Sequence, residues 1–375
     1  MISAKGKAYN IDSIIIGKLD TDINNKKSGV ILLTDSKEQV QIALSTVLYV
    51  GVMTENEIPD VKVPMLVLEK KWQQVFASKD IVIIYPNGTC ILEYKECWHD
   101  LTIFFSNDCN SNCIMCPQTE NEEHGAFVEI NNRILDLAPD GLEYMGITGG
   151  EPTLYEGELL SLMAKVHRTY PNLPISLLTN GRRFQDRNLV RRMSAIGHKK
   201  LMACIPLYAA NHAQHDRIVG RNGAFVETLR GIFNLYQAGI LVEIRIVIGR
   251  FNNLWLQDIS EFLLRNLPFV RHIAFMGMEY TGNALKNYDE IVIDPYDYRN
   301  ELDQATWRLH RRGMNVSIYN IPLCLLERRS WIFARDSISA WKKEYVEKCE
   351  DCQQRTKCCG LFATSNYISG NLHTL

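Results

Sequence analysis

The sequence contains no long apolar run and no excess of charge of one sign. None of its apolar stretches approaches the roughly 20 residues of a membrane-spanning helix, and the formal net charge is −2 over 375 residues. We therefore expect neither a membrane nor nucleic acid as a partner. The opening segment Met1–Lys7 is not followed by an apolar signal region, which predicts a cytoplasmic protein.

Cysteine, in contrast, is abundant, with eleven residues. In a large chain without a signal segment, this number points to metal binding or catalysis rather than to disulfides. Three of them, Cys109, Cys113 and Cys116, form a compact loop directly after the predicted strand Leu101–Phe105. A closed four-iron cluster takes four thiolates, so a loop with three would leave one iron open. A zinc site or a set of buried thiols would use the same spacing.

A second motif follows the next predicted strand, Glu143–Thr148. It reads Gly149, Gly150, Glu151, Pro152. Paired glycines let a ligand approach the backbone, and a carboxylate beside them can accept hydrogen bonds from an amino group. An ordinary turn from strand to helix would use the same residue types.

The cysteine loop and the Gly-Gly-Glu-Pro turn together resemble the CxxxCxxC and GGEP signature of the radical S-adenosylmethionine (SAM) superfamily. The resemblance implies a catalytic [4Fe-4S] cluster on Cys109, Cys113 and Cys116, with SAM chelating the open iron beside Gly149–Pro152. Reductive cleavage of SAM would then give a 5′-deoxyadenosyl radical. Met115 stands where relatives usually have an aromatic residue, and its thioether is able to pack against an adenine.

Alternating strands and helices predict the fold. Six predicted strands alternate with amphipathic helices, which favours an α/β architecture with a parallel sheet. The count fits a partial (β/α)6 TIM-type barrel, in which chemistry gathers at the carboxyl ends of the strands. We predict three domains: a β-rich region at residues 1–98, the radical SAM barrel at 99–313, and a small Cys-rich domain at 314–375. The predicted barrel strands are Leu101–Phe105, Glu143–Thr148, Ile175–Thr179, Leu201–Pro206, Val242–Ile248 and His272–Met276.

The first ninety-odd residues contain short apolar runs separated by polar turns. One predicted strand covers Val47–Val52, and Asn87–Gly88 predicts a hairpin. A helix is predicted at Glu69–Ala77. This region either docks a substrate or partner, or is purely structural.

Further segments resemble the superfamily at matching positions. Leu178–Gly181 ends the third barrel strand, where relatives often contact substrate, and Phe275–Gly282 follows the sixth strand, where they contact adenine and ribose. Many relatives have a ribose-binding Ser after the fourth strand, but this chain has Pro206 and Leu207 there.

The segment after the fourth strand resembles that of peptide-modifying members through Asp216, Arg217 and Gly220. His212 and His215 also lie there, and their spacing favours surface loop residues over metal ligands or catalytic bases.

A second cysteine group lies in the C-terminal tail, at Cys324, Cys349, Cys352 and Cys358. The spacing resembles the SPASM and twitch domains of peptide-modifying radical enzymes, which implies an auxiliary [4Fe-4S] cluster, with structural zinc as the alternative. Cys359 is an alternative to Cys358 as a ligand. A helix is predicted just before this group, at Ser337–Glu347.

Within the superfamily, the chain most resembles the His-Xaa-Ser system maturases. We therefore expect a radical SAM peptide maturase that acts on a ribosomally synthesised peptide, with a flavodoxin or ferredoxin as reductant and a sister radical SAM maturase as a further partner. The alternatives are a radical SAM enzyme that acts on a nucleoside or sugar, and a metal-bound peptide-binding scaffold without catalysis.

Overall fold

The computed structural model describes residues 2–44, 51–55, 63–72, 74–118 and 124–375. The chain divides into two compact units. One comprises Met1–Phe105, Phe127–Ile147 and Arg168–Ile175, and the other comprises Ser106–Ala126, Thr148–His167 and Ser176–Leu375. Within the described residues, no helix combines the length and the apolar character needed to cross a bilayer.

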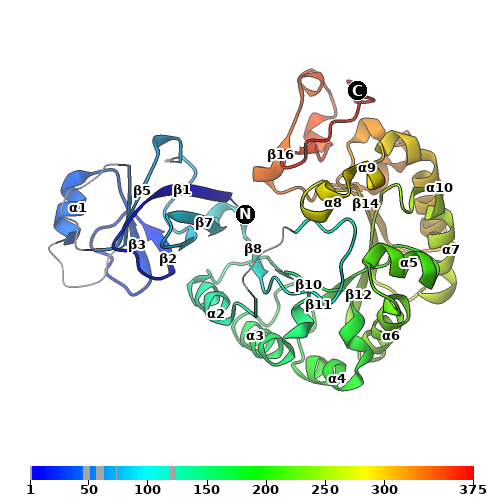
Figure 1. Ribbon diagram of the computed structural model, residues 1–375, viewed down its shortest axis with the longest axis horizontal. Helices are drawn as coiled ribbons and strands as arrows, with labels where there is room; N and C mark the ends of the chain where they lie inside the picture. Colours follow the sequence, from blue (N-terminus) through cyan, green and yellow to red (C-terminus); the bar gives the residue numbers. More distant parts are fainter. Residues whose placement is uncertain (1, 45–50, 56–62, 73, 119–123) are drawn as a thin grey trace. The chain divides into compact units, whose positions relative to one another are not determined.

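The N-terminal region is a closed β-barrel with the strand order β1-β5-β4-β3-β2-β6-β7 (Figure 1). Gly88 turns the predicted hairpin between the last two strands with φ +82°, and its carbonyl accepts from Gly6 N at 2.9 Å. The strands are β1 (Ile2–Tyr9), β2 (Ile15–Asp20), β3 (Val30–Leu33), β4 (Gly51–Thr54), β5 (Met65–Leu68), β6 (Ile81–Ile84) and β7 (Thr89–Tyr94).

Two predictions for this region need correction. Among the described residues of Glu69–Ala77, where a longer helix was predicted, the structure has one short 3-10 helix, Lys70–Trp72. Helix α1 (Lys37–Leu44) was not predicted. Residues 47–50 of the predicted strand Val47–Val52 lie outside the described residues, and β4 begins at Gly51.

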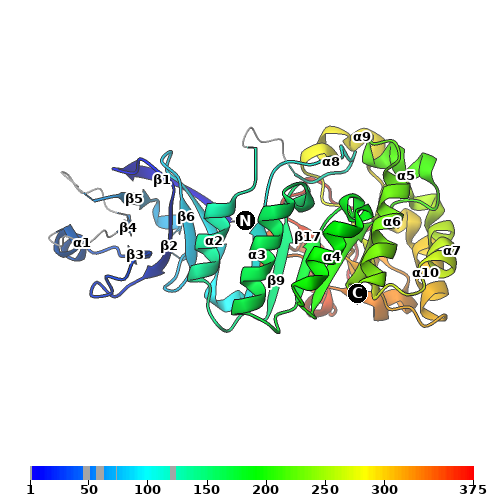
Figure 2. The ribbon, with the colours of Figure 1, turned by 90° about the horizontal axis from the view of Figure 1, so that it is seen from below.

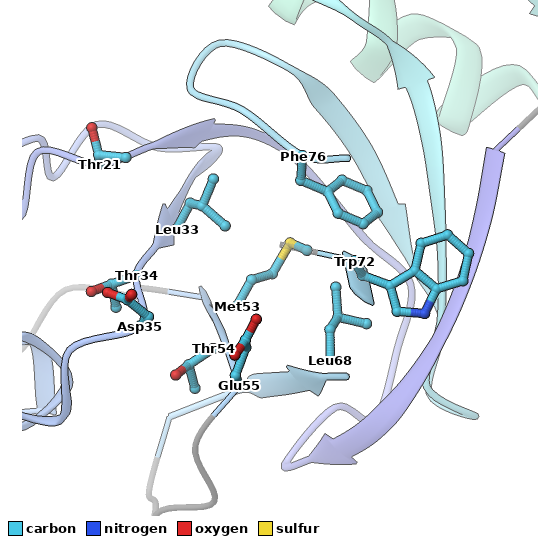
Figure 3. A pocket seen from close by; sticks show the side chains of 10 residues that line it. All are labelled: Thr21, Leu33, Thr34, Asp35, Met53, Thr54, Glu55, Leu68, Trp72 and Phe76. Atoms are coloured by element: carbon cyan, nitrogen blue, oxygen red, sulfur yellow. The ribbon is translucent and has the colours of Figure 1, made fainter. Parts of the chain in front are cut away.

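A cavity of about 200 Å³ lies in the N-terminal barrel (Figure 3). Its apolar side is formed by Leu33, Met53, Leu68, Trp72 and Phe76. Three of these side chains also belong to the buried core of the barrel, so the cavity continues the core rather than interrupting it.

The second sheet has eight strands in the order β15-β14-β13-β12-β11-β10-β9-β8, and the pairs from β11 to β15 are all parallel. This curled parallel sheet is a partial TIM-type barrel, as predicted. The strands are β8 (Asp100–Phe104), β9 (Tyr144–Thr148), β10 (Ile175–Leu178), β11 (Leu201–Pro206), β12 (Leu241–Val247), β13 (His272–Met276), β14 (Val316–Tyr319) and β15 (Ala334–Arg335).

The predicted number of six strands was two short. Strand β14 pairs in parallel with β13, and β15 pairs with β14, so both extend the barrel sheet although they follow residue 313. The predicted division between residues 313 and 314 therefore falls within a segment that leads into this sheet.

Helices lie along the outside of the sheet, as Figures 1 and 2 show for α4, α6, α7 and α10. Apolar spacing explains this packing: α6 buries Phe225, Ile232 and Leu235 on one side. The helices are α2 (Val128–Leu137), α3 (Glu156–Thr169), α4 (Arg187–Ala195), α5 (His212–Val219), α6 (Ala224–Gln237), α7 (Leu256–Asn266), α8 (Gly282–Lys286), α9 (Tyr288–Ile291) and α10 (Arg299–His310).

The predicted helix Ser337–Glu347 was wrong. This segment contains a short 3-10 helix, Ala340–Lys342, and then β16 (Lys343–Glu344), which pairs with β17 (Leu361–Phe362). Pairing with the tail overrides the helical tendency of the local sequence, as tertiary contacts commonly do.

Candidate functional site

The cysteine loop is held by backbone hydrogen bonds on two sides. Asn112 N donates to Val219 O and Ile114 N donates to Ile218 O, each at 3.0 Å. On the other side, Asn283 N donates to Cys116 O at 2.8 Å. The loop has no regular secondary structure, so these contacts are what satisfy and fix its backbone.

Side-chain amides add to this support. Asn283 Nδ2 donates to Cys113 O at 3.2 Å, and Asn287 Nδ2 donates to Ile114 O at 2.8 Å. Both asparagines follow β13 and lie just after Phe275–Gly282, the segment that was predicted from the resemblance to contact adenine and ribose. The residues that follow this segment therefore support the cysteine loop directly.

Three glycines make the close approach to the loop sterically feasible. A Cβ at Gly150 would collide with Asp108 O, and one at Gly282 would collide with Gln118 O. A Cβ at Gly220 would lie 2.5 Å from Asn112 O, and Gly220 also has φ +65°. Glycine is needed at this position for two independent reasons, backbone conformation and space.

The Gly-Gly-Glu turn joins the cysteine loop directly. Gly150 N donates to Ser106 O, and Glu151 N donates to Asp108 O, both at 2.7 Å. Gln118 Nε2 donates to the carbonyl of Gly149. The cysteine loop and the Gly-Gly-Glu turn, whose signature residues are 33 or more positions apart in the sequence, are therefore joined by hydrogen bonds.

The Glu151 carboxylate is fully buried and is used within the chain. It accepts from Thr179 Oγ1 at 2.7 Å, from Asn180 N at 2.6 Å and from Thr153 N at 3.0 Å. Burial raises the pKa of Glu151, and these hydrogen bonds act in the opposite direction. The contact of this carboxylate with an amino group stays a prediction, and in the structure both oxygens accept hydrogen bonds from within the chain.

The three thiols of the loop lie within electrostatic reach of one another. Burial raises the pKa of Cys113 to about 12, and the nearby Cys116 and Cys109 add to the rise. Burial likewise raises the pKa of Cys109 to about 11. A metal centre would reverse this by binding the deprotonated forms. The donor set therefore fits a thiolate-bound cluster that ionises these thiols on binding.

Arg182 is a site residue that the sequence analysis missed. Its side chain is 7% exposed, and its Nη1 donates to Asn110 O at 2.6 Å and to Ser111 Oγ at 3.0 Å. Its Nε donates to Glu227 at 2.7 Å. Its positive charge opposes the rise in pKa of Cys109. The only signal in the sequence was its place next to the Thr-Asn-Gly turn.

The turn before Arg182 also supports the cysteine loop. Asn180 Nδ2 donates to Asn110 Oδ1 at 2.6 Å. The segment Leu178–Gly181 was predicted to contact substrate, but the described contacts of Asn180 tie it to the cysteine loop and to Glu151.

Asp108 was also missed. Its carboxylate accepts from Tyr155 Oη and from Gly125 N at 2.8 Å, and it lies 2.6 Å from His124 Nδ1. The Tyr155 hydrogen bond, followed by those of Gly125 and His124, lowers the pKa of Asp108 to about 2. This charged group ties both ends of the loop to the turn after Gly-Gly-Glu-Pro.

His215 was predicted to be a surface loop residue, and this was wrong. It is a buried residue of helix α5. Its ring stacks on Tyr208 with centroids 5.9 Å apart, and its Nδ1 accepts from Tyr208 N at 3.3 Å. Burial lowers the pKa of His215 to about 4. His212, in contrast, is exposed.

Tyr208 lies at the end of β11, next to the Pro206 and Leu207 that replace the expected Ser. Its ring belongs to an apolar cluster with Met115, against which Cys113 also packs. Burial, and then the three loop thiols, raise the pKa of Tyr208 well above its usual range, so it remains an O–H donor.

The four predicted cysteines of the tail also lie near one another. The charges of Cys358 and Cys349 raise the pKa of Cys324 after burial does, and those of Cys358 and Cys352 raise that of Cys349. No group of three or more His, Cys, Asp or Glu side chains in the described ranges is placed to hold a single metal ion.

The structure distinguishes the two adjacent cysteines of the tail. Cys359 is buried, and it hydrogen bonds to Cys358, which lowers the pKa of Cys358 to about 6. Leu323 N also donates to Cys358 Sγ at 3.5 Å. The charge of Cys358 also acts on both Cys324 and Cys349, so Cys358 stays the predicted ligand of the two. Elsewhere, Cys204 is buried in β11, as expected of a core residue.

Residues 103–263 match the sequence profile of the Radical SAM superfamily. The Fe-coproporphyrin III synthase of Methanosarcina barkeri is 27% identical over 221 residues, which cover 57% of this chain and 53% of that protein. The sporulation killing factor maturation protein SkfB of Bacillus subtilis is 26% identical over 163 residues, 43% of this chain and 38% of SkfB.

The GTP 3′,8-cyclase of Aquifex aeolicus is 24% identical over 206 residues, 51% of this chain and 62% of the cyclase. The chain thus spans about half the length of the curated relatives it matches. Among solved structures, Streptococcus suis SuiB bound to S-adenosylmethionine aligns with a TM-score of 0.48 and 17% identity, covering 61% of this chain and 51% of SuiB. Residues 103–263 are therefore a radical SAM domain.

Proposed function

We propose that this enzyme modifies a side chain of a ribosomally synthesised peptide, with His-Xaa-Ser repeat peptides as the first class to test. The observation that carries the proposal is the second group of four neighbouring cysteines in the tail, in addition to the three of the loop. The similarity to the maturation protein SkfB supports a peptide substrate.

Cys109, Cys113 and Cys116 are the ligands we propose for the catalytic [4Fe-4S] cluster, with SAM on the fourth iron. The turn Gly149–Pro152 would hold the amino group of SAM, with the Gly149–Gly150 backbone beside it and the Glu151 carboxylate fixing the turn through its hydrogen bonds to Thr179 and Asn180. When bound, the cluster and SAM supply a 5′-deoxyadenosyl radical for abstraction of a substrate hydrogen.

The protein's own residues keep this arrangement rigid. Asp108, through Tyr155, and Arg182, through Asn110, attach the cysteine loop to the turns after β9 and β10 by charge-assisted hydrogen bonds. Tyr208 and Met115 cover the apolar side of the loop and limit the access of water to it. Rigid support of this kind fixes the reacting groups in place and lowers the entropic part of the barrier.

Cys324, Cys349, Cys352 and Cys358 are the ligands we propose for an auxiliary [4Fe-4S] cluster, with zinc as the alternative. We further propose a flavodoxin or ferredoxin as electron donor and a sister radical SAM maturase as a partner in the cell. An auxiliary cluster would take up an electron from the substrate radical or help to bind the peptide.

The proposal is tested by anaerobic turnover with SAM and reductant. One arm contains a synthetic peptide with His-Xaa-Ser repeats, and the other contains a panel of nucleosides, sugars and porphyrins. A change in peptide mass that depends on SAM, and that is lost in Cys113→Ala but kept in Cys97→Ala, is expected. Cys97 is exposed and lies outside both cysteine groups, so it is a matched control.

A small-molecule substrate is the second candidate, because relatives named GTP 3′,8-cyclase and Fe-coproporphyrin III synthase also match this chain. Turnover of a metabolite but of no peptide would favour it. A third reading, a metal-bound scaffold that binds peptide without catalysis, would require that SAM is never cleaved.

A further inference from the structure

Strand β12 presents two charged residues to the interior of the barrel. Neighbouring residues of a strand point to opposite faces. Ile244 and Ile246 are fully buried, and β12 packs against α6. The alternate residue Val247 packs with Met115 and Tyr208 in the site cluster. Glu243, Arg245 and Val247 are alternate residues of β12, so their side chains point to the same face, the interior of the barrel. Glu243 and Arg245 precede Val247 and therefore lie closer to the amino-terminal end of the strand.

A chain of hydrogen bonds across three strands holds Arg245. Ser317 Oγ lies 2.9 Å from His272 Nε2, and His272 Nδ1 lies 2.7 Å from Glu243 Oε2. Arg245 Nε donates to Glu243 Oε1 at 2.6 Å. The radical SAM chemistry proposed above does not use any of these four side chains.

The side chains joined by these hydrogen bonds differ in their exposure to solvent. The Glu243 side chain is 6% exposed and His272 is 10% exposed, but Arg245 is 26% exposed. Burial raises the pKa of Glu243, but His272 and Arg245 outweigh it and hold the pKa at about 2. Glu243 is therefore a fixed anion that orients the guanidinium, and Arg245 is the member that solvent can reach.

The strand pairing of Arg245 places it beside the proposed reaction site. Arg245 pairs with Pro206 of β11, and Leu207 N donates to Arg245 O at 3.0 Å, directly before Tyr208. Val247, two residues further along β12, packs in the same cluster as Tyr208. Arg245 therefore lies next to the segment that carries Tyr208, on the face of β12 that leads to the cysteine loop.

We propose that Arg245 is a carboxylate-binding residue that fixes an acidic group of the substrate in the barrel interior. A guanidinium presents a planar set of donors that matches a carboxylate, and an arginine held in advance loses little freedom on binding. The inference deepens the proposed function, because the carboxylate belongs to the substrate of that site: a Glu or Asp side chain in a peptide, or a free acid. Glu243, His272 and Ser317 act as positioning residues for Arg245.

Binding to the full chain, without SAM and without turnover, tests this inference. Calorimetry and ligand-observed NMR would compare the capped peptide acetyl-Ala-Glu-Ala-amide, its Gln counterpart, and succinate. We expect the Glu peptide to bind the wild-type chain at least tenfold more tightly than the Gln peptide. Arg245→Gln should abolish this preference, and Arg312→Gln, which changes an exposed arginine after α10, should leave it intact.

Two further variants guard against a folding defect. Arg245→Lys keeps the charge but not the planar fork, so its preference should fall between wild type and Arg245→Gln. His272→Gln should reduce the preference without removing Arg245 itself. Circular dichroism would show that each variant is folded.

Equal affinity for the Glu and Gln peptides, together with no binding of succinate, would overturn the inference. A preference that survives in Arg245→Gln would also overturn it. Succinate binding that depends on Arg245, without binding of the Glu peptide, would support the carboxylate site and contradict the peptide substrate. The two proposals can therefore fail separately.

Discussion

The carboxylate of Glu151 accepts a hydrogen bond from the backbone N–H of Asn180 at 2.6 Å. The ends of β9 and β10 are thereby fixed to each other beneath the cysteine loop, because Asn180 also binds Asn110 through its side chain. Glu151, which belongs to the turn predicted to hold the amino group of SAM, is thus also a buried acceptor that joins two strand ends.

Glu151→Gln should destabilise the site. The amide presents a donor where the carboxylate accepts from Thr179 and Asn180, and leaving a buried donor unsatisfied costs about 1–3 kcal/mol. Chemical denaturation would measure the loss of unfolding free energy. The matched change Glu158→Gln, at an exposed position of α3, should alter it by less than about 0.5 kcal/mol. Equal effects of the two substitutions would contradict the assigned role.

Gly220→Ala should disrupt the cysteine loop. The added Cβ would lie 2.5 Å from Asn112 O, in addition to the roughly 1–2 kcal/mol that a left-handed conformation costs. Gly223→Ala is the natural control, because Gly223 has φ +81° but nothing lies within 4 Å of its Cβ position. Iron content after reconstitution should fall in Gly220→Ala and stay near wild type in Gly223→Ala. A similar loss in both would show that backbone conformation alone is responsible.

Stability should decline in mildly acidic solution because of His215. Burial lowers its pKa from the ordinary value of 6.5 to about 4, so the folded state binds fewer protons than the unfolded state between these pH values. The stabilisation is complete above about pH 6.5 and is lost as the pH falls towards 4. Melting temperatures measured across this range should show a weaker dependence in His215→Phe than in wild type or in His212→Gln. An unchanged pH dependence in His215→Phe would contradict the argument.

The tail should bind its metal independently of the loop. In a Cys109/Cys113/Cys116→Ala variant, EPR and iron and sulfide analysis should still detect a [4Fe-4S] cluster bound by the tail cysteines. Adding Cys358→Ala should remove it, whereas adding Cys359→Ala should not, because Cys359 is buried and Cys358 is the one of the two whose charge acts on both Cys324 and Cys349. Zinc without iron in the triple variant would show that the tail site is structural zinc.

Much of the barrel was predictable because its signals are local. The strand His272–Met276 was predicted with its observed bounds, and both signature loops were placed correctly at strand ends. Strands β14 and β15 were not counted because their pairing with β13 is a long-range contact, and nothing in Asn315–Tyr319 itself indicates the sheet to which it belongs. Short strands carry little periodicity of their own.

The supporting residues of the site were harder to find. Arg182 and Asp108 resemble ordinary surface charges in the sequence, and only the fold shows that Arg182 is buried against Asn110 and Ser111. Glu243 left a clearer signal, since a charged residue in the middle of a buried apolar strand requires a partner. His215 was misplaced because its segment contains several polar residues, whereas the helix turns it towards Tyr208 and Phe225.

The formation of 5′-deoxyadenosine tests the central claim most directly. The reconstituted wild-type chain, with SAM and a strong reductant under anaerobic conditions, should release 5′-deoxyadenosine and methionine, and the Cys109/Cys113/Cys116→Ala variant should release neither. Chromatography with mass detection would quantify both products. Absence of 5′-deoxyadenosine from wild-type protein with a full complement of iron, or its continued formation by the triple variant, would contradict the account.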